Sequence, residues 1–183
     1  MTKYEIIYEA LQEKVNNNEI DITFAEEVNV LAYEKYKDDI DKKYTYKNIS
    51  SNEIDKFYKD LDIVFNSNSS KHDISRKDVL KCIKIIKCNN KFIGYIGFSY
   101  FNEDNRKYLG LSNFAIIPKY QRMGHGTNII NDIIEQYKNK YDEIYCWVSK
   151  DNKNAISFYK KIANVTNKLN KDNMYYVELY KKK

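Results

Sequence analysis

The spacing of hydrophobic residues predicts a pair of amphipathic helices at the start of the chain. In residues 2–17 apolar side chains recur every three or four positions, as on one face of a helix: Tyr4, Ile7, Tyr8, Leu11 and Val15. Residues 23–39 show the same spacing: Phe24, Val28, Leu31 and Ala32. Each segment begins with the Thr-x-x-Glu spacing of a capping box, at Thr2 and at Thr23. We therefore expect residues 1–41 to form a helical hairpin that precedes the main domain.

The remaining residues, 42–183, alternate between strand and helix patterns. Strands are predicted where hydrophobic residues alternate or form short runs: 42–49, 79–88, 91–101, 108–117, 143–149, 165–169 and 174–181. Helices are predicted at 50–65, where Ser50 and Glu53 form a capping box, at 124–139 and at 152–163. Residues 66–71 form a polar loop, and turns are expected at 89–90 and 171–173. The fold class is therefore α/β (α+β), with helices flanking a sheet.

Composition excludes several classes of protein. A chain of 183 residues suits one domain with a small appendage. No apolar run approaches the roughly 18 residues that cross a bilayer, and the first residues lack the pattern of a signal peptide, so we expect a cytoplasmic protein without membrane contact. Three cysteines and two histidines favour neither a disulfide framework nor a metal site. Cys82, Cys88 and Cys146 are expected to be small buried hydrophobic residues.

Charge is distributed unevenly along the chain, although its net value is only +5. Residues 1–41 carry 4 Lys against 11 Asp and Glu, whereas residues 76–183 carry 21 Lys and Arg against 10 Asp and Glu. A basic second half suits a polyphosphate ligand or a nucleic acid. An ordinary solvated surface in a lysine-rich chain explains the same charge, and we favour that explanation.

The segment 114–130 combines features of an anion-binding site. A hydrophobic strand ends at Pro118, and after a short turn a helix begins at Gly124 and Gly126. The N–H groups at a helix N-terminus bind anions, and glycines let a phosphate approach the backbone. Tight packing of the strand against the helix would explain the two glycines equally well. The segment lacks the Gly-Lys-Ser/Thr of a Walker A loop and the third glycine of a dinucleotide-binding loop.

Two motifs resemble those of the GCN5-related N-acetyltransferase (GNAT) family. Residues 121–126 read Q-x-x-G-x-G after a strand that ends in Ile-Ile-Pro, and they resemble the pyrophosphate loop of that family. Residues 148–159 read V-x-x-x-N-x-x-A-x-x-F-Y and resemble its downstream segment. The resemblance covers about residues 42–180. It implies a mostly antiparallel sheet whose middle strands splay apart after a bulge, with helices on both faces.

The resemblance also implies a binding site for acetyl-CoA. Backbone N–H groups of one loop would hold the pyrophosphate: Met123, Gly124, His125, Gly126 and Thr127. Gln121 and Arg122 would lie at the same corner. The pantetheine arm would pair with the strand edge formed by Phe114, Ala115 and Ile116, and it would accept a hydrogen bond from Asn152. An N–H group near Ile116 would polarise the thioester, and Tyr159 would donate a proton to the leaving thiolate as the catalytic acid.

Each of these residues also has a plain structural explanation. Tyr159 could belong to the core, and Asn152 could serve only as a helix N-cap. We expect His125 to be a surface side chain and Trp147 to contribute to packing. Arg122 stands where the family often has glycine, which is tolerable if its φ is negative.

The family often places a Glu near the middle strands as general base, but this sequence has none at the matching positions, 110–113 and 146–148. Glu103 and Asp104 are expected in a loop. The resemblance therefore implies an acetyl-CoA-dependent N-acetyltransferase in which a primary amine attacks directly within a ternary complex. The acceptor would be a small-molecule or peptide amine, and the protein a monomer or homodimer. The missing carboxylate leaves an inactive CoA-binding regulatory module as an alternative. The basic second half leaves a tRNA-directed toxin of the same family as another, less favoured one.

Overall fold

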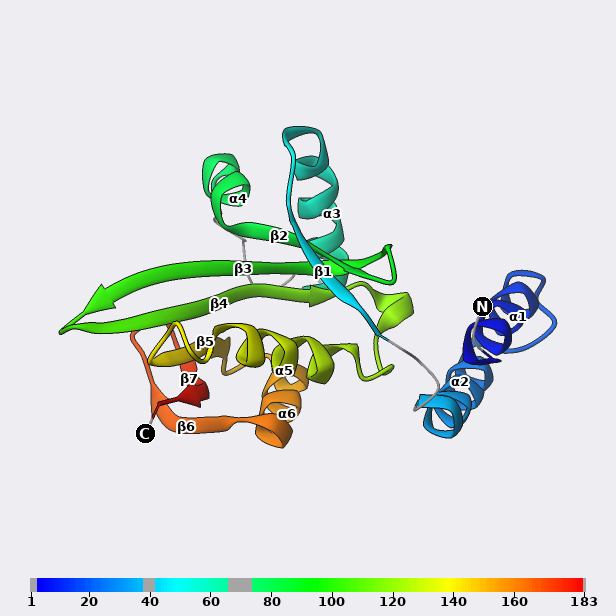
Figure 1. The fold of residues 1–183 in the computed structure, drawn as a ribbon. Coiled ribbons are helices and arrows are strands. Elements are labelled where there is room, and N and C mark those ends of the chain that lie inside the picture. Colours follow the sequence, from blue (N-terminus) through cyan, green and yellow to red (C-terminus); the bar gives the residue numbers. More distant parts are fainter. Residues whose placement is uncertain (1–2, 38–41, 66–73, 183) are drawn as a thin grey trace. The chain divides into compact units, whose positions relative to one another are not determined.

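The computed structural model describes residues 3–37, 42–65 and 74–182. These form two compact units, residues 1–43 and residues 44–183, which are described separately (Figure 1). Within the described ranges, no helix combines the length and the apolar composition required to cross a membrane.

The first unit is a pair of helices, as the sequence predicts: α1 (Lys3–Asn16) and α2 (Ile22–Tyr36). Tyr4 joins them, because its hydroxyl donates to Asn29 Oδ1 at 2.8 Å and its ring meets the edge of Tyr33. The N-cap of α2 is Asp21, which accepts from the N–H of Thr23 at 2.7 Å. The predicted capping box at Thr23 is therefore wrong, because an aspartate two residues earlier starts the helix. Thr2 lies outside the described residues.

The apolar stripe predicted for α2 is also wrong in part. Ala25 and Ala32 are buried, whereas 54% of Phe24 and 70% of Leu31 are exposed. The small alanines let the two helices approach closely, and the larger side chains lie outside that contact.

The second unit contains a seven-stranded sheet in the order β1-β2-β3-β4-β5-β7-β6. Its strands are β1 (Tyr44–Asn48), β2 (Ile83–Cys88), β3 (Lys91–Glu103), β4 (Arg106–Ile116), β5 (Glu143–Ser149), β6 (Asn164–Leu169) and β7 (Met174–Lys181). β4 and β5 run parallel, and the other neighbouring strands run antiparallel. The predicted mixed, mostly antiparallel sheet is therefore confirmed. Asn89 and Asn90, both at positive φ, form the tight turn predicted between β2 and β3.

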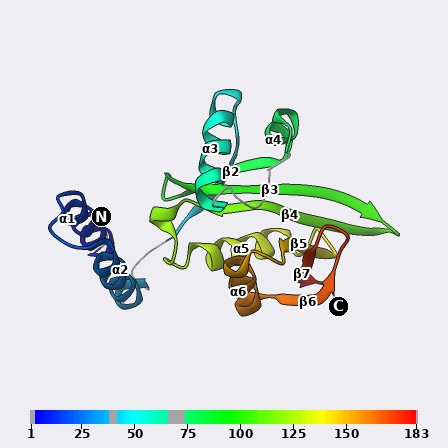
Figure 2. The same cartoon turned by 180° about the vertical axis from the view of Figure 1, so that it is seen from behind.

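Helices cover both faces of this sheet, as Figures 1 and 2 show. On one face lie α3 (Ile54–Phe65), entered through the short 3-10 helix η2 (Ser51–Glu53), and α4 (Arg76–Cys82). On the other lie α5 (His125–Tyr137) and α6 (Lys153–Ile162). The capping box before α3 is confirmed, because the Ser50 N–H donates to Glu53 Oε2 at 2.9 Å.

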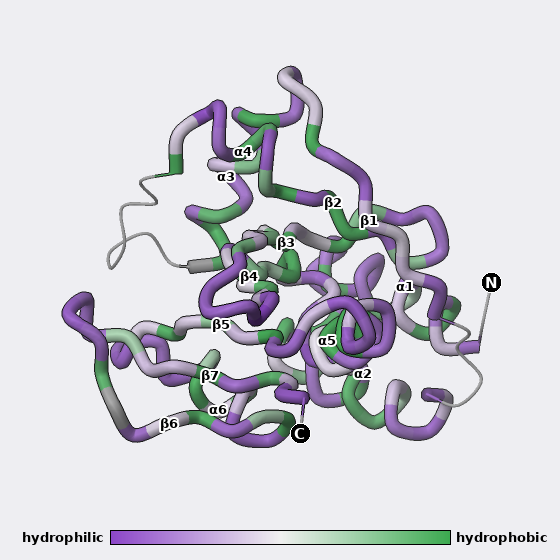
Figure 3. Tube along the Cα trace, turned by 60° about the vertical axis from the view of Figure 1, so that its left-hand side comes forward, coloured by the Kyte–Doolittle hydropathy of each residue, from purple (hydrophilic) through white to green (hydrophobic). Residues whose placement is uncertain are grey.

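Each face has its own hydrophobic core, and Figure 3 shows hydrophobic residues along the central strands and α5. Phe57 of α3 and Val79 of α4 pack with Tyr95 of β3 on one face. Buried residues of α5, α6 and the strands pack on the other: Ile129, Ile130, Ile133, Phe98, Leu111, Cys146 and Tyr159 among them. The helix predicted at 124–139 is confirmed as α5, and its isoleucines belong to this core.

Two predicted elements have other bounds in the structure. Residues 79–82 are the end of α4, not the start of a strand, because Ser75 Oγ caps a helix by accepting from the Asp78 N–H at 3.2 Å. Cys82 therefore lies on a helix and is partly exposed, while Cys88 and Cys146 are buried as expected. The β3–β4 hairpin is longer than predicted and turns at Asp104 and Asn105, so Glu103 ends a strand.

Candidate active site

The central feature of the site is the point where β4 and β5 stop pairing. The parallel ladder runs from Tyr108↔Glu143 to Leu111↔Cys146. β4 continues to Ile116 and β5 to Ser149, so both strands extend past the last pair. β5 remains paired with β7 up to Ser149. The two middle strands therefore splay apart beyond this last pair. We call the gap between them the splay, and its closed end lies at Leu111 and Cys146. Backbone edges with unused hydrogen-bonding capacity face this gap.

A β-bulge at Asn113 produces this divergence. On β3, Tyr95 pairs with Ala115 and Gly97 with Ser112, so Ile96 faces both Asn113 and Phe114. Asn113 has φ 46°, a left-handed conformation typical of such an extra residue. Beyond the bulge, Phe114 and Ile116 pack on the α5 and α6 face, while Ala115 joins the opposite core. The sequence does not reveal this change of face, because it depends on one inserted residue.

The backbone beyond the bulge is oriented toward the gap at Ile116. The N–H of Ile117 donates to Ile93 O on β3 at 2.9 Å. Because successive residues of a strand direct their polar groups to opposite sides, the N–H and C=O of Ile116 face the β5 side. There the Ile116 C=O accepts a hydrogen bond from Gln121 Nε2 at 2.8 Å. Gln121 thus ties the end of β4 to the following loop.

The loop between β4 and α5 turns on two left-handed residues. After the short 3-10 helix η3 (Pro118–Tyr120), Arg122 has φ 62° and Gly124, the N-cap of α5, has φ 71°. The condition under which arginine would be tolerable at position 122, a negative φ, is therefore not met. Arginine here occupies a conformation that glycine adopts at lower cost.

The N-terminus of α5 is tightly packed. A Cβ atom on Gly126 would lie 3.2 Å from Phe158 Cε2 on α6 and 4.0 Å from Phe114 Cε1 on β4. Gly126 therefore lets the first turn of α5 approach both elements. In that turn the N–H groups of Gly126 and Thr127 have no acceptor within the helix, because the first intrahelical bond runs from Asn128 to Gly124. These donors and the positive end of the helix dipole favour an anion.

Two side chains of this loop anchor it in the protein. Met123 and His125 are only 3% and 7% exposed. His125 Nδ1 lies 3.0 Å from the Tyr44 hydroxyl, and its ring meets Tyr44 and Tyr120 edge-on. The expectation of a surface histidine is therefore wrong, since β1 and η3 enclose the imidazole. A residue of β1 could not be assigned to this contact from the sequence, because 81 positions separate it from His125.

Asn152 is the N-cap of α6, because its Oδ1 atom accepts from the Ala155 N–H at 3.0 Å. The explanation of Asn152 as a helix N-cap therefore holds for its side-chain carbonyl oxygen. The cap leaves the Nδ2 amide as the part of this side chain that can donate to a ligand.

Tyr159 of α6 reaches the closed end of the splay. The residue is 7% exposed, and its hydroxyl lies against the thiol of Cys146, the β5 residue of the last β4–β5 pair. Burial raises the pKa of Tyr159 well above its usual value, and the neighbouring Cys146 raises it further. Burial also raises the pKa of the Cys146 thiol to about 12. Both groups therefore keep their protons at neutral pH.

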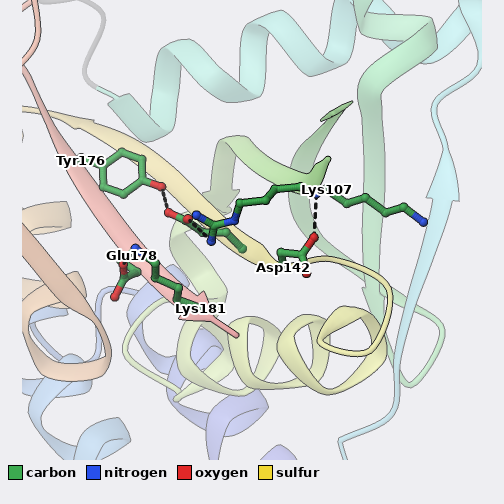
Figure 4. A network of polar contacts seen from close by, with 7 residues as sticks. Lys107, Asp142, Tyr176, Glu178 and Lys181 are labelled. Carbon is green, nitrogen blue, oxygen red and sulfur yellow. Dashed lines mark hydrogen bonds and ion pairs between the residues drawn. The ribbon is translucent and has the colours of Figure 1, made fainter. Parts of the chain in front are cut away.

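Glu143, at the start of β5, is a buried carboxylate that the sequence patterns do not single out. Glu143 is 6% exposed, it accepts a hydrogen bond from the Tyr176 hydroxyl, and its Oε2 atom lies 3.5 Å from Arg106 Nη2. Figure 4 shows the Tyr176 hydroxyl directed at this carboxylate. The sequence does contain a signal for this residue, because Glu143 is an acidic residue at the first position of an otherwise largely apolar strand. Trp147, further along β5, packs edge-on against Tyr176 as expected, but 42% of it remains exposed.

Known proteins share both this sequence pattern and this fold. The model of the Acetyltransferase (GNAT) family matches residues 46–163. N-alpha-acetyltransferase 50 of Danio rerio is 28% identical over 99 residues, which are 51% of this chain and 59% of that protein. The chain thus matches a little over half the length of this relative.

Solved structures show the same fold. Arabidopsis thaliana Naa50, in complex with the bisubstrate analogue CoA-Ac-MVNAL, has a TM-score of 0.54 at 18% identity, covering 74% of this chain and 97% of its own. PaiA N-acetyltransferase of Thermoplasma acidophilum, in complex with coenzyme A, has a TM-score of 0.57 at 14% identity, covering 77% and 99%. Together with a family match over well over half of its residues, this likeness shows that the chain belongs to the GNAT acetyltransferase family.

Proposed function

We propose that the protein is an acetyl-CoA-dependent N-acetyltransferase in which a primary amine attacks the thioester directly within a ternary complex. One observation carries the proposal: the gap between β4 and β5 has the anion-favouring N-terminus of α5 beyond its open end and the Tyr159 hydroxyl at its closed end. A long ligand with a diphosphate at one end and a reactive sulfur at the other suits this arrangement.

The residues present fit coenzyme A. The loop 121–127 ends in backbone N–H donors at a helix N-terminus, which favour an anionic group. Met123, Gly124, His125, Gly126 and Thr127 would hold the pyrophosphate, with Gln121 and the positive charge of Arg122 beside it. The strand edge at Phe114, Ala115 and Ile116 would pair with the peptide-like arm, as an added strand does. The Nδ2 group of Asn152 would donate to the same arm.

Acetyl-CoA, when bound, supplies the acetyl thioester. The Ile116 N–H faces the gap, and a donor fixed in this way stabilises negative charge that develops on a carbonyl oxygen. Tyr159 keeps its proton at neutral pH and can donate it from its hydroxyl oxygen to a thiolate. Residues 112–116 and 146–149 contain no carboxylate, so the amine would lose its proton to water. Positioning the amine next to the thioester supplies the larger part of the rate acceleration.

The relatives support this cofactor, since Naa50 of Arabidopsis thaliana was solved with a bisubstrate CoA analogue and PaiA with coenzyme A. Their low sequence identity to this chain leaves the acceptor to experiment.

Two measurements test the proposal. Calorimetry should detect binding of acetyl-CoA, and a thiol assay should detect CoA release when amines and short peptides are added. Gly126→Val should weaken CoA binding by about tenfold or more, because the added side chain meets Phe158 and Phe114 and displaces the first turn of α5. Asn131→Ala, at an exposed position of the same helix, is the control and should bind normally.

The outcomes separate the alternatives. Binding without thiol release for any amine would favour a regulatory CoA-binding module. Absence of binding to the intact protein would contradict the proposed function.

A further inference from the structure

Five aromatic side chains form a continuous surface over the middle of the sheet, on the face opposite α5 and α6. Phe101 of β3 stacks on Tyr108 of β4 at 4.8 Å between ring centroids, and it meets the edge of Tyr145 of β5 at 6.0 Å. Tyr145 stacks on Tyr176 of β7 at 5.1 Å, and Tyr176 meets Trp147 of β5 at 5.0 Å. We call these five residues the aromatic platform.

Strand register places all five rings on one face. Tyr108 is opposite Phe101 on β3 and Glu143 on β5, and Trp147 is opposite Tyr176 on β7. The intervening residues, Leu109, Cys146 and Val177, belong to the core under α5 and α6. Both Phe101 and Trp147 retain much exposed surface, 39% and 42%. A continuous patch of exposed aromatic side chains is typical of ligand-binding surfaces.

The platform adjoins the candidate active site at one end. Trp147 directly follows Cys146, the residue of the last β4–β5 pair. The Tyr159 hydroxyl contacts Cys146 from the α6 side, whereas the indole of Trp147 lies on the opposite side of the sheet. A ligand on the platform would therefore meet the closed end of the splay from the face opposite the proton donor.

The far end of the platform already holds a cation. The Arg106 guanidinium lies 5.5 Å from the centre of the Tyr108 ring and forms an ion pair with buried Glu143. Glu178 of β7, opposite Tyr145, is a second carboxylate on this face and forms an ion pair with Lys181 at 3.6 Å. Electron-rich ring faces and carboxylates both attract positive charge. At the Trp147 end only the ring faces of Trp147 and Tyr176 remain, and these favour an ammonium group.

We propose that the aromatic platform binds the acceptor, and that the acceptor is a primary amine carrying an aromatic or extended apolar group. This inference rests on the proposed function, because it concerns the same reaction. Ring surfaces gain free energy by stacking against an apolar body, and they offer few partners for hydroxyl groups, so a polyhydroxylated amine would lose its hydration without replacement. Phenethylamine fits this chemistry, and glucosamine does not.

Trp147 is the single tryptophan of the chain, so its fluorescence reports directly on the platform. The intact protein, saturated with CoA, would be titrated with phenethylamine, hexylamine and glucosamine under selective excitation of the indole. We expect a saturable change whose midpoint for phenethylamine is about tenfold lower than for glucosamine, with hexylamine between them. No saturable change with phenethylamine, or equal midpoints for phenethylamine and glucosamine, would overturn the inference.

A matched pair of variants gives a second test by turnover. Trp147→Ala should raise KM for phenethylamine by about tenfold and leave the Kd for CoA unchanged. Tyr100→Ala is the control, because Tyr100 is 53% exposed but stacks on Tyr141 at the other face of β3. Equal KM values in Trp147→Ala and the wild type would count against the platform. If no amine is turned over, the proposed function fails, and the fluorescence titration still decides whether the platform binds amines.

Discussion

The Tyr159 hydroxyl on α6 lies against the Cys146 thiol on β5, at the residue where pairing between β4 and β5 ends. Both side chains are buried, and burial raises the pKa of each. The contact thus holds a protonated phenol at the closed end of the splay, where the proposed reaction requires a proton donor.

Tyr159→Phe should lower kcat by about a hundredfold and leave CoA binding unchanged, because the ring keeps its packing while the proton donor is lost. Steady-state kinetics and calorimetry measure the two effects. Tyr95→Phe is the matched control: Tyr95 is equally buried and donates to Asp60 Oδ2 at 2.8 Å, on the face under α3. A wild-type kcat in Tyr159→Phe would refute the role of general acid.

The bulge at Asn113 should depend on its left-handed backbone. Asn113→Gly should leave stability and CoA affinity close to those of the wild type, because glycine adopts a positive φ freely. Asn113→Val should cost about 2 kcal/mol of unfolding free energy and weaken CoA binding, because a β-branched residue is strained there. Chemical denaturation and calorimetry provide the comparison. If the two variants behave alike, the divergence of β4 does not depend on this conformation.

His125 should act as a structural anchor for the loop before α5. His125→Ala should lower the unfolding free energy by about 2 to 3 kcal/mol, because it leaves a cavity between Tyr44 and Tyr120. Tyr44→Phe removes only the hydroxyl and should cost about 1 kcal/mol. Urea unfolding measures both values. A smaller loss in His125→Ala than in Tyr44→Phe would show that packing of the imidazole is not what secures the loop.

Stability should fall at alkaline pH because of buried tyrosines. Burial raises the folded-state pKa of Tyr95 and of Tyr159 well above 10.0, the ordinary value for tyrosine. Above about pH 10 the unfolded chain loses these protons and the folded protein retains them, so the unfolding free energy decreases as pH rises. Below that pH the contribution is fully present. Above about pH 10, each such tyrosine should lower the unfolding free energy by about 1.4 kcal/mol for every pH unit.

Urea unfolding about one pH unit on either side of pH 10 tests this expectation. Tyr95→Phe should show a smaller decrease than the wild type, since it removes one of the groups. An equal decrease in both proteins would assign the alkaline loss to other residues.

Local patterns were sufficient to predict most elements. The isoleucines of α5 recur at helical spacing, and the paired asparagines at positions 89 and 90 mark a turn, so neighbouring residues alone specify these structures. The prediction was wrong where two local signals competed. The apolar run 79–88 suits a strand. Ser75 lies upstream and caps a helix, however, and residues 79–82 belong to that helix.

Residue types at short spacing are enough to predict the fold class, the family motifs and the positions of the glycine loop and of Tyr159. Three other features become visible only in the folded chain: Tyr44 encloses His125, Asn113 turns the end of β4, and five rings from four strands form one surface. Such contacts join residues far apart in the chain. They depend on strand order and register. Packing over the whole sheet selects that order and register, and no single segment encodes them.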